Sequence, residues 1–158
     1  MCSSDLHLDI KPQNLFLVGA HVKVADFGLV KDLEGCTASV TGGVTPVYAP
    51  PETFDGWVSR NSDQYSLAIV YQELLTGQRP FSGPSARQFM MQHLSSDPDL
   101  SPLPPVDRPI VQKALSKDPN QRFASCSEFV RMLEGKATVV VDRDQAQIPD
   151  RKSTRLNS

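Results

Sequence analysis

The sequence predicts a mainly α-helical domain with one small β-hairpin close to its start. Two short runs of β-type residues, 16–18 and 22–24, flank the turn residues Gly19-Ala20-His21, a pattern typical of a hairpin. A nearly all-apolar stretch then begins at Asp63 and stops at Gly77. Such a stretch predicts a buried helix that glycine ends.

Further helices are predicted downstream. Residues 79–94 indicate a turn followed by a helix that packs through Phe89, Met90 and Leu94, and residues 95–105 form a Pro-, Ser- and Asp-rich loop. Residues 125–128 have the pattern of a capping box that opens a last helix, which Gly135 closes. The residues expected to face the core from the last two helices are Ile110, Val111, Ala114, Leu115, Phe129, Met132 and Leu133.

Composition bounds the class of protein. The chain has 158 residues, enough for one domain with a core, and a net charge of −2, which makes no case for a nucleic-acid partner. No apolar run reaches the roughly 20 residues of a membrane helix. The cysteines Cys2, Cys36 and Cys126 lack metal-site spacing, so we expect reduced thiols in a cytoplasmic domain. His21 and His93 are expected on the surface or in packing.

The two ends differ from the rest of the chain. Neither residues 1–6 nor residues 150–158 show hydrophobic periodicity. One choice of codons for residues 1–6 is the reverse complement of one that encodes residues 150–154 and opens the next codon, and the string is similar to a sequencing adapter. We therefore expect both ends to be adapter-derived and the chain to be an internal piece of a longer protein. The alternative is a polar disordered tail.

Polar residues gather around the predicted hairpin. In HLDIKPQNLFL, residues 7–17, Asp9, Lys11 and Asn14 precede it, and Asp26-Phe27-Gly28 follows it. Because a hairpin brings its outer ends together, Asp9, Asn14 and Asp26 should converge. Two carboxylates and an amide carbonyl form an oxygen ligand set suited to Mg²⁺.

The order H-x-D-x-K-x-x-N followed by D-F-G resembles the eukaryotic-like (Hanks-type) Ser/Thr protein kinases, and the chain looks bacterial. The resemblance covers residues 7–135 and only the C-terminal lobe of that fold, with residues 136–149 starting a linker. It implies that Asp9 accepts the proton of the substrate hydroxyl and that Lys11 neutralises the γ-phosphate of ATP. Asn14 and Asp26 would hold Mg²⁺ or Mn²⁺.

Further positions match the same family. GVTPVYAPPE, residues 43–52, resembles the end of an activation segment, in which Thr45 would hydrogen-bond Asp9 and Lys11. Glu52 would form a buried ion pair with Arg122 of KDPNQRF, which fixes the segment because breaking such a pair strands a charge.

Other matching residues would support the catalytic loop. Asp63 would accept backbone N–H groups of that loop, a role compatible with capping its own helix. The ring of His7 would pack under the loop near Phe27 and Gly28, which makes it structural and not a general base.

The chain also departs from the family pattern. Leu8 stands where Arg usually pairs with a phosphorylated activation-loop residue, so we expect no need for phosphate on Thr37, Ser39 or Thr41. Pro50 replaces a small residue. The printed residues include no Gly-rich loop, no strand lysine and no adenine hinge, so ATP would be held only by its metal and phosphates. The chain alone is therefore expected to be inactive.

Three functions remain in competition. The leading one is a cytoplasmic Ser/Thr kinase, or a membrane-anchored protein that carries one, acting on Ser or Thr of protein substrates with an N-terminal lobe from the same protein. A pseudokinase or stand-alone lobe that binds proteins is the second, and intact Asp9, Lys11, Asn14 and Asp26 argue against it. A small-molecule phosphotransferase is the third, and Thr45, Glu52 and Arg122 favour protein substrates instead.

Overall fold

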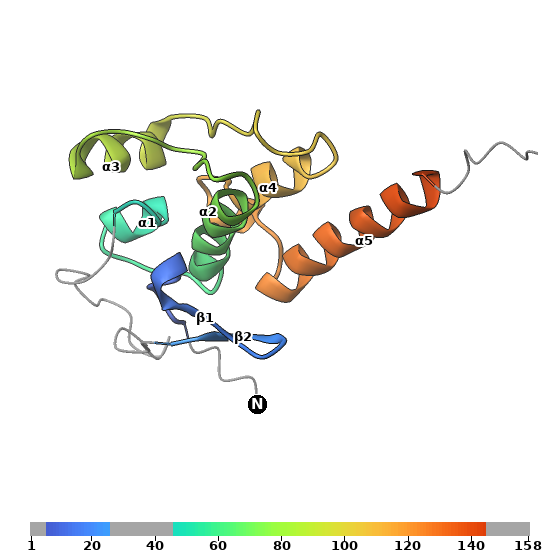
Figure 1. Ribbon diagram of the computed structural model, residues 1–158. Coiled ribbons are helices and arrows are strands. Elements are labelled where there is room, and N and C mark those ends of the chain that lie inside the picture. Colours follow the sequence, from blue (N-terminus) through green and yellow to red (C-terminus); the bar gives the residue numbers. More distant parts are fainter. Residues whose placement is uncertain (1–5, 26–45, 145–158) are drawn as a thin grey trace, which may run out of the picture.

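Two short strands precede a helical body in the computed structural model, which describes residues 6–25 and 46–144, with side chains through residue 135 (Figure 1). The predicted site residues Asp26, Phe27, Gly28 and Thr45 lie outside the described residues, as do residues 1–5 and 145–158. The elements are η1 Pro12–Asn14, β1 Leu15–Val18, β2 His21–Val24, α1 Pro51–Phe54, α2 Ser62–Thr76, α3 Ala86–Ser95, α4 Arg108–Ala114, η2 Pro119–Gln121 and α5 Cys126–Asp144.

The predicted hairpin is confirmed. β1 and β2 are antiparallel with Val18 opposite His21, so the connecting loop is only Gly19-Ala20. The expectation that His21 belongs to the turn is wrong, because the strand already begins there. Gly19 has a φ of +63° and Ala20 is not among the positive-φ residues, the pattern of a type II′ turn, whose twist matches the flanking strands.

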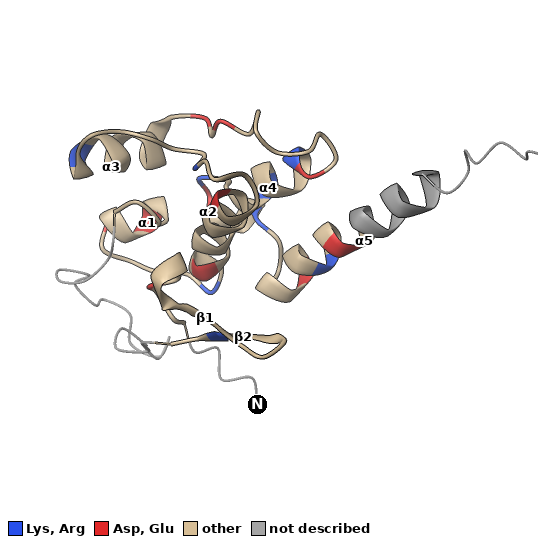
Figure 2. Cartoon of the chain, in the orientation of Figure 1, with Lys and Arg blue, Asp and Glu red and all other residues tan. Residues whose placement is uncertain are grey.

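The hairpin presents apolar side chains to solvent. Leu17 is 75% exposed, and Phe16, Val18, Val22 and Val24 are exposed as well. In Figure 2 its ribbon is tan except at one basic position, Lys23. A contiguous exposed apolar group of this kind marks a surface that a partner or another part of a protein covers.

α2 occupies the middle of the helical body, between α1, α4 and α5 (Figure 1). Tyr65, Ile69 and Val70 on this helix are at most 1% exposed. The helix ends as predicted, because Gly77 takes the left-handed conformation at φ +72° and its N–H bonds to the carbonyl of Glu73 at 2.8 Å.

The core lies around α2 and unites residues from α2, α3, α4 and α5 with residues of the connecting loops. The predicted stripe of α4 is confirmed, since Ile110, Val111, Ala114 and Leu115 are all buried. Leu6, at the edge of the segment expected to be adapter-derived, is also buried, with 3% of its surface exposed. The core cluster comprises Tyr48, Tyr65, Ala68, Ile69, Val70, Phe81, Phe89, Leu100, Leu103, Ile110, Val111, Ala114, Leu115, Phe123 and Phe129.

α5 opens as predicted but differs further along. Ser125 Oγ accepts the N–H of Glu128 at 3.1 Å, and the Glu128 carboxylate accepts the N–H of Ala124 at 2.8 Å. Phe129 is fully buried, as predicted. Met132 is 43% exposed, which corrects its assignment to the core, because the stripe of Cys126, Phe129 and Leu133 leaves it about 90° off the buried face.

The predicted end of the last helix at Gly135 is wrong. α5 continues to Asp144, so residues 136–144 are helical where a linker was expected. Glycine inside a helix costs only about 1 kcal/mol relative to alanine, and the following Lys136 and Ala137 are good helix formers. That cost is too small to stop a helix that is already anchored by Phe129.

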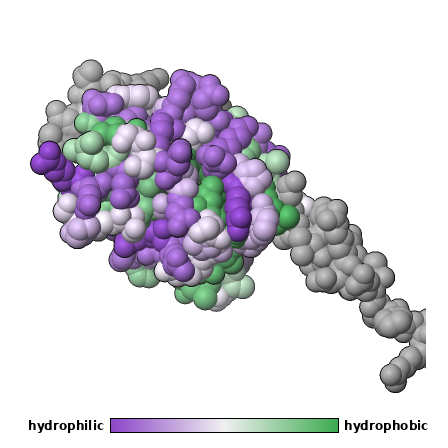
Figure 3. Space-filling model, turned by 90° about the horizontal axis from the view of Figure 1, so that it is seen from above, coloured by the Kyte–Doolittle hydropathy of each residue, from purple (hydrophilic) through white to green (hydrophobic). Residues whose placement is uncertain are grey.

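The surface of the described part mixes both signs of charge. Acidic and basic residues are interspersed over several elements in Figure 2, and apolar groups are separated by hydrophilic ones on the face in Figure 3. Within residues 6–25 and 46–144, no helix is long and apolar enough to span a bilayer.

His93 on α3 is fully buried, so of the two expectations for it packing is confirmed and surface placement is wrong. Its ring centroid lies 4.6 Å from that of Phe81 and 5.6 Å from that of Tyr65. Tyr65 Oη lies 2.9 Å from Nδ1, and the Val47 carbonyl lies 3.2 Å from Nε2. Because a carbonyl only accepts, Nε2 carries the proton, Nδ1 accepts from Tyr65, and the ring is neutral.

We predict that His93 makes the stability of the chain depend on pH. Burial, with Lys117 nearby, lowers the pKa of His93 from 6.5 to about 4. Between pH 4 and pH 6.5 the unfolded state binds more protons than the folded state. The free energy of unfolding therefore has its full value above pH 6.5. It falls by roughly 3 kcal/mol as pH drops toward 4.

Urea unfolding of wild type and His93→Gln from pH 7.5 to 4.5 measures this effect. The difference between the two unfolding free energies should shrink as pH falls, because glutamine does not titrate. A difference that stays constant across the range would show that His93 titrates normally.

Candidate active site

Asp9, Lys11 and Asn14 gather at the loop that precedes β1. Lys11 Nζ lies 2.7 Å from Asp9 Oδ2, and Asn14 Nδ2 donates to the same oxygen at 3.0 Å and to the Asp9 carbonyl at 2.9 Å. The side chains of Lys11 and Asp9 keep 21% and 9% of their surface exposed. A cation and an amide thus each lie within hydrogen-bond distance of the Asp9 carboxylate, and the group keeps some exposed surface.

Asn14 is fixed at the junction between η1 and β1. Its N–H bonds to the Lys11 carbonyl at 3.0 Å, and its own carbonyl accepts the N–H of Ala25 at 2.8 Å. The side-chain nitrogen must face Asp9, because both groups there are acceptors. This orientation leaves Oδ1 as the atom suited to ligate a hard cation such as Mg²⁺.

Ala25 brings the chain after β2 back to the loop. Besides the bond to Asn14, its carbonyl lies 3.0 Å from His7 Nε2. The residue immediately before Asp26 is therefore anchored beside Asn14. In the described part of the chain no cluster of three His, Cys, Asp or Glu could hold a metal. The metal ligands expected from the sequence are Asn14 and Asp26, and Asp26 lies outside that part.

The ring of His7 lies under the loop. Nδ1 accepts the N–H of Asp9 at 3.3 Å, so the proton sits on Nε2 and points at the Ala25 carbonyl. Both ring nitrogens are engaged by backbone. The ring therefore connects the loop before β1 to the residue that follows β2.

Asp63, in the first turn of α2, holds the same loop from below. Its Oδ2 accepts the N–H of His7 at 2.7 Å and its Oδ1 accepts the N–H of Leu8 at 2.8 Å. The helix cap is Asn61, so Asp63 makes the predicted contact to the loop without being the cap residue. Burial raises the pKa of Asp63, and the two N–H groups act in the opposite direction.

Leu8 carries backbone strain that the sequence does not reveal. Its φ is +61°, the left-handed region that costs a residue with a Cβ roughly 1–2 kcal/mol. Its side chain is buried, with 9% exposed. A residue remains in such a conformation only when its surroundings hold it there, and the bond from Leu8 N–H to Asp63 is one such restraint.

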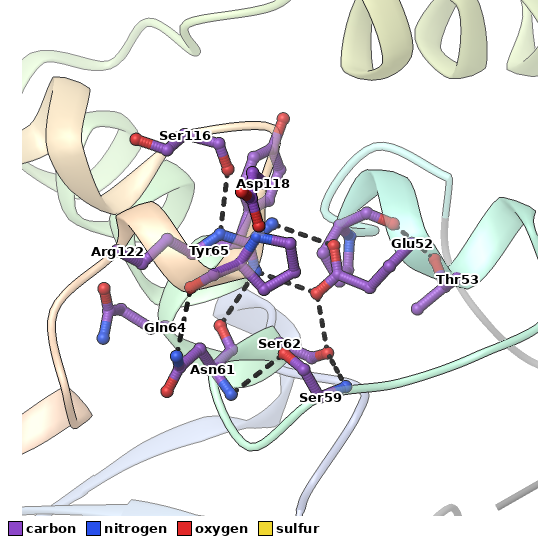
Figure 4. A network of polar contacts seen from close by, with 12 residues as sticks. Glu52, Thr53, Ser59, Asn61, Ser62, Gln64, Tyr65, Ser116, Asp118 and Arg122 are labelled. Atoms are coloured by element: carbon purple, nitrogen blue, oxygen red, sulfur yellow. Dashed lines mark hydrogen bonds and ion pairs between the residues drawn. The ribbon is translucent and has the colours of Figure 1, made fainter.

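Glu52 and Arg122 form the predicted ion pair, 70 residues apart in sequence (Figure 4). Arg122 Nη1 and Nη2 each donate to one oxygen of Glu52 at 2.8 Å. The two side chains are 0% and 1% exposed. Ser62 Oγ adds a third donor to the Glu52 carboxylate at 2.8 Å.

Gln64 was missed by the sequence reasoning, although it is fully buried beside this pair. Its amide nitrogen donates to the Phe123 carbonyl at 3.1 Å and its oxygen accepts the Phe123 N–H at 3.0 Å. The side chain thus pairs with backbone as a neighbouring strand would. The only available signal was a glutamine inside an apolar helix.

Residues 46–49 lead from the position of Thr45 into α1. Ser66 Oγ donates to the Tyr48 carbonyl at 2.7 Å, and Tyr48 Oη donates to Glu73 at 2.8 Å. Burial, reinforced by Glu73, raises the pKa of Tyr48 to about 12. Pro50, a departure noted in the sequence, directly precedes α1, and its carbonyl accepts the hydroxyl of Thr53 at 2.6 Å.

Residues 4–133 of the chain match the family model described as protein kinase domain. The chain is 34% identical over 157 residues to the serine/threonine-protein kinase PknF of Mycobacterium tuberculosis. This alignment covers 90% of the chain and 33% of PknF. It is 34% identical over 130 residues to PknA of the same species, covering 78% of the chain and 30% of PknA.

A third relative comes from Corynebacterium efficiens. It is named serine/threonine-protein kinases drp72 and is 36% identical over 134 residues, covering 81% of the chain and 26% of the relative. The chain therefore spans about a third or less of the length of the curated relatives that it matches.

We predict that Asp63→Asn destabilises the chain by about 1–3 kcal/mol, because the new NH₂ group faces a backbone N–H and leaves it buried without an acceptor. The free energy of urea unfolding measures the loss. Asp55→Asn, at an exposed position, is the matched control and should unfold like wild type. Equal unfolding free energies for both variants would contradict the restraint assigned to Asp63.

Proposed function

Because this chain belongs to the protein kinase family, we propose that it is the C-terminal lobe of a bacterial Hanks-type Ser/Thr protein kinase. The whole protein transfers the γ-phosphate of ATP to Ser or Thr hydroxyls of protein substrates. The observation that carries this proposal is the cluster of Asp9, Lys11 and Asn14, gathered on one loop at hydrogen-bond distances.

Asp9 is the proposed proton acceptor. A substrate hydroxyl within hydrogen-bond reach of its carboxylate is oriented toward the phosphate and loses its proton to Asp9 as the new bond forms. Asn14 donates to Asp9 Oδ2 and thereby limits the rotation of the carboxylate. This restraint supports positioning, which is most of what phosphoryl transfer needs from a protein.

Lys11 is the proposed phosphate contact. Its ammonium group lies 2.7 Å from the Asp9 carboxylate, so a phosphate that approaches Asp9 also comes close to this positive charge. Charge spreads over the equatorial oxygens of the transferring group, and a nearby cation stabilises it. Thr45, outside the described residues, is proposed to bond Asp9 and Lys11 and so to join them to the substrate-facing segment.

Asn14 and Asp26 are the proposed ligands of Mg²⁺ or Mn²⁺. The amide orientation of Asn14 fits this role, since its nitrogen is directed at Asp9 and its oxygen is the remaining ligand atom. When bound there, the metal would supply positive charge that neutralises the phosphates of ATP.

The exposed hairpin supports the assignment to a C-terminal lobe. Phe16 and Leu17 stand open to solvent directly after the catalytic loop, where an N-terminal lobe of the same protein would cover them. We propose that residues 7–135 are the lobe and that the chain alone does not transfer phosphate.

A stand-alone lobe that binds proteins, as in a pseudokinase, is the alternative. The apolar hairpin favours it, because such a surface can dock a partner. The catalytic cluster argues for the enzyme, since docking on the hairpin does not need Asp9, Lys11 and Asn14.

We predict that Asp9→Asn in the whole protein lowers the kcat for phosphorylation of a Ser/Thr peptide by about 10²–10⁴, the usual contribution of a general base. Transfer of ³²P from labelled ATP measures it. Gln13→Asn, an exposed change in the same loop, is the control and should keep wild-type activity. If Asp9→Asn transfers phosphate as wild type does, the assignment of the base is wrong.

We further predict that the whole kinase works without phosphate on its activation loop. Leu8 is apolar and buried at the position where the family usually has an arginine, so it cannot pair with a phosphate. Phosphatase-treated protein should retain its initial rate of peptide phosphorylation. A rate that collapses on this treatment and returns when Thr37, Ser39 or Thr41 is rephosphorylated would refute the prediction.

A further inference from the structure

The segment 46–49 is held by side chains from two different helices. Ser66 on α2 binds the carbonyl of Tyr48, and His93 on α3 binds the carbonyl of Val47. Adjacent carbonyls are therefore anchored to separate elements. This segment begins one residue after Thr45 and ends where α1 follows Pro50.

His93 is built to make this contact in one orientation. Nδ1 accepts the hydroxyl of Tyr65, and Nε2–H donates to the Val47 carbonyl. The ring also packs against Phe81 at 4.6 Å and Phe54 at 6.2 Å between centroids. With no exposed surface, the imidazole is fixed by its surroundings before any substrate arrives.

Lys117 lies over the ring of Phe81, which in turn contacts His93. Lys117 Nζ lies 4.6 Å from the centroid of the Phe81 ring and donates to the Gln92 carbonyl at 3.1 Å. The cation thus ties the last turn of α3 to the aromatic side chain that packs on His93. The position of Nε2 depends on this assembly and not on α3 alone.

We propose that His93 is a positioning residue for protein substrates, acting through the Val47 carbonyl on the segment that follows Thr45. This inference rests on the proposed kinase function. Under that function Thr45 would bond Asp9 and Lys11, so a peptide whose Ser or Thr hydroxyl lies within hydrogen-bond reach of Asp9 would have its neighbouring residues near the segment that follows Thr45. Holding that segment in place favours binding of the peptide and leaves the ATP contacts on Asn14 and Lys11 unchanged.

Two conservative variants separate the two hydrogen bonds of His93. In His93→Gln the terminal amide nitrogen comes nearest to the place of Nε2 and can still donate to Val47. In His93→Asn the shorter side chain can still accept from Tyr65 but does not reach Val47. Tyr65→Phe is the matched control, because it removes the other partner of the ring and leaves the Val47 bond.

Steady-state kinetics of the whole kinase with a Ser/Thr peptide test the proposal. His93→Asn should raise the KM for peptide about fivefold to tenfold, the effect of losing one buried hydrogen bond, while the KM for ATP stays at the wild-type value. His93→Gln and Tyr65→Phe should keep the wild-type KM for peptide. Partial unfolding would lower kcat in proportion to the active fraction and move neither KM.

The outcomes distinguish this inference from the function on which it rests. If wild type does not phosphorylate the peptide, the proposed function fails. If wild type is active and His93→Asn changes only kcat, or changes the KM for peptide no more than Tyr65→Phe does, the positioning role of His93 is wrong.

Discussion

The buried ion pair between Glu52 and Arg122 is the constraint on which the arrangement of the helices depends. Removing two charges from water is costly, and attraction between them offsets that cost only when the remaining hydrogen-bonding groups are also satisfied. Arg122 meets this condition, because Nε donates to Ser116, Nη1 to Asn61 and Nη2 to Lys117 in addition to the bonds to Glu52. Its guanidinium also stacks over the ring of Tyr65, 4.9 Å from the centroid.

This pair positions the first turn of α2, and that turn connects four separate parts of the fold. Successive helical residues point about 100° apart, so each of the consecutive residues 62–65 reaches a different neighbour. The contacts run from Ser62 to Glu52, from Asp63 to the loop at His7, from Gln64 to Phe123 and from Tyr65 to His93. A polar start to a buried helix is tolerated here because these side chains all have partners.

The elements that could be predicted from sequence are those with a local signal. The turn at Gly19, the end of α2 at Gly77 and the capping of α5 by Ser125 depend on residues close in sequence, and all are present. The ion pair of Glu52 with Arg122 was predictable only through a resemblance, since no local pattern links residues so far apart. The exposure of Met132 was mispredicted because the buried face of α5 is set by Phe129, and the helix beyond Gly135 was mispredicted because the small cost of a glycine inside a helix does not end it.

Other features of the site had no sequence signal at all. Nothing in the composition of the loop shows that Leu8 adopts a positive φ, because one restraint on this conformation is the bond to Asp63, 55 residues away in sequence. Likewise a histidine in an otherwise mixed helix does not reveal that α3 buries it against Val47 and Tyr65. Long-range partners determine both cases, and a single sequence does not contain them.

The proposed catalytic side chains and the side chains that hold the backbone in place differ in burial. Asp9 and Lys11 remain partly accessible, whereas Glu52, Arg122 and His93 are almost entirely buried. Accessible side chains can meet a substrate, but on their own they would sample many rotamers and lose the geometry that positions it. Buried, fully bonded side chains cannot reorganise without stranding a polar group, so they hold the backbone beneath the accessible ones. The loop of Asp9 and Lys11 can therefore include a strained residue such as Leu8, because one restraint on it, the Asp63 carboxylate, belongs to the buried part of the fold.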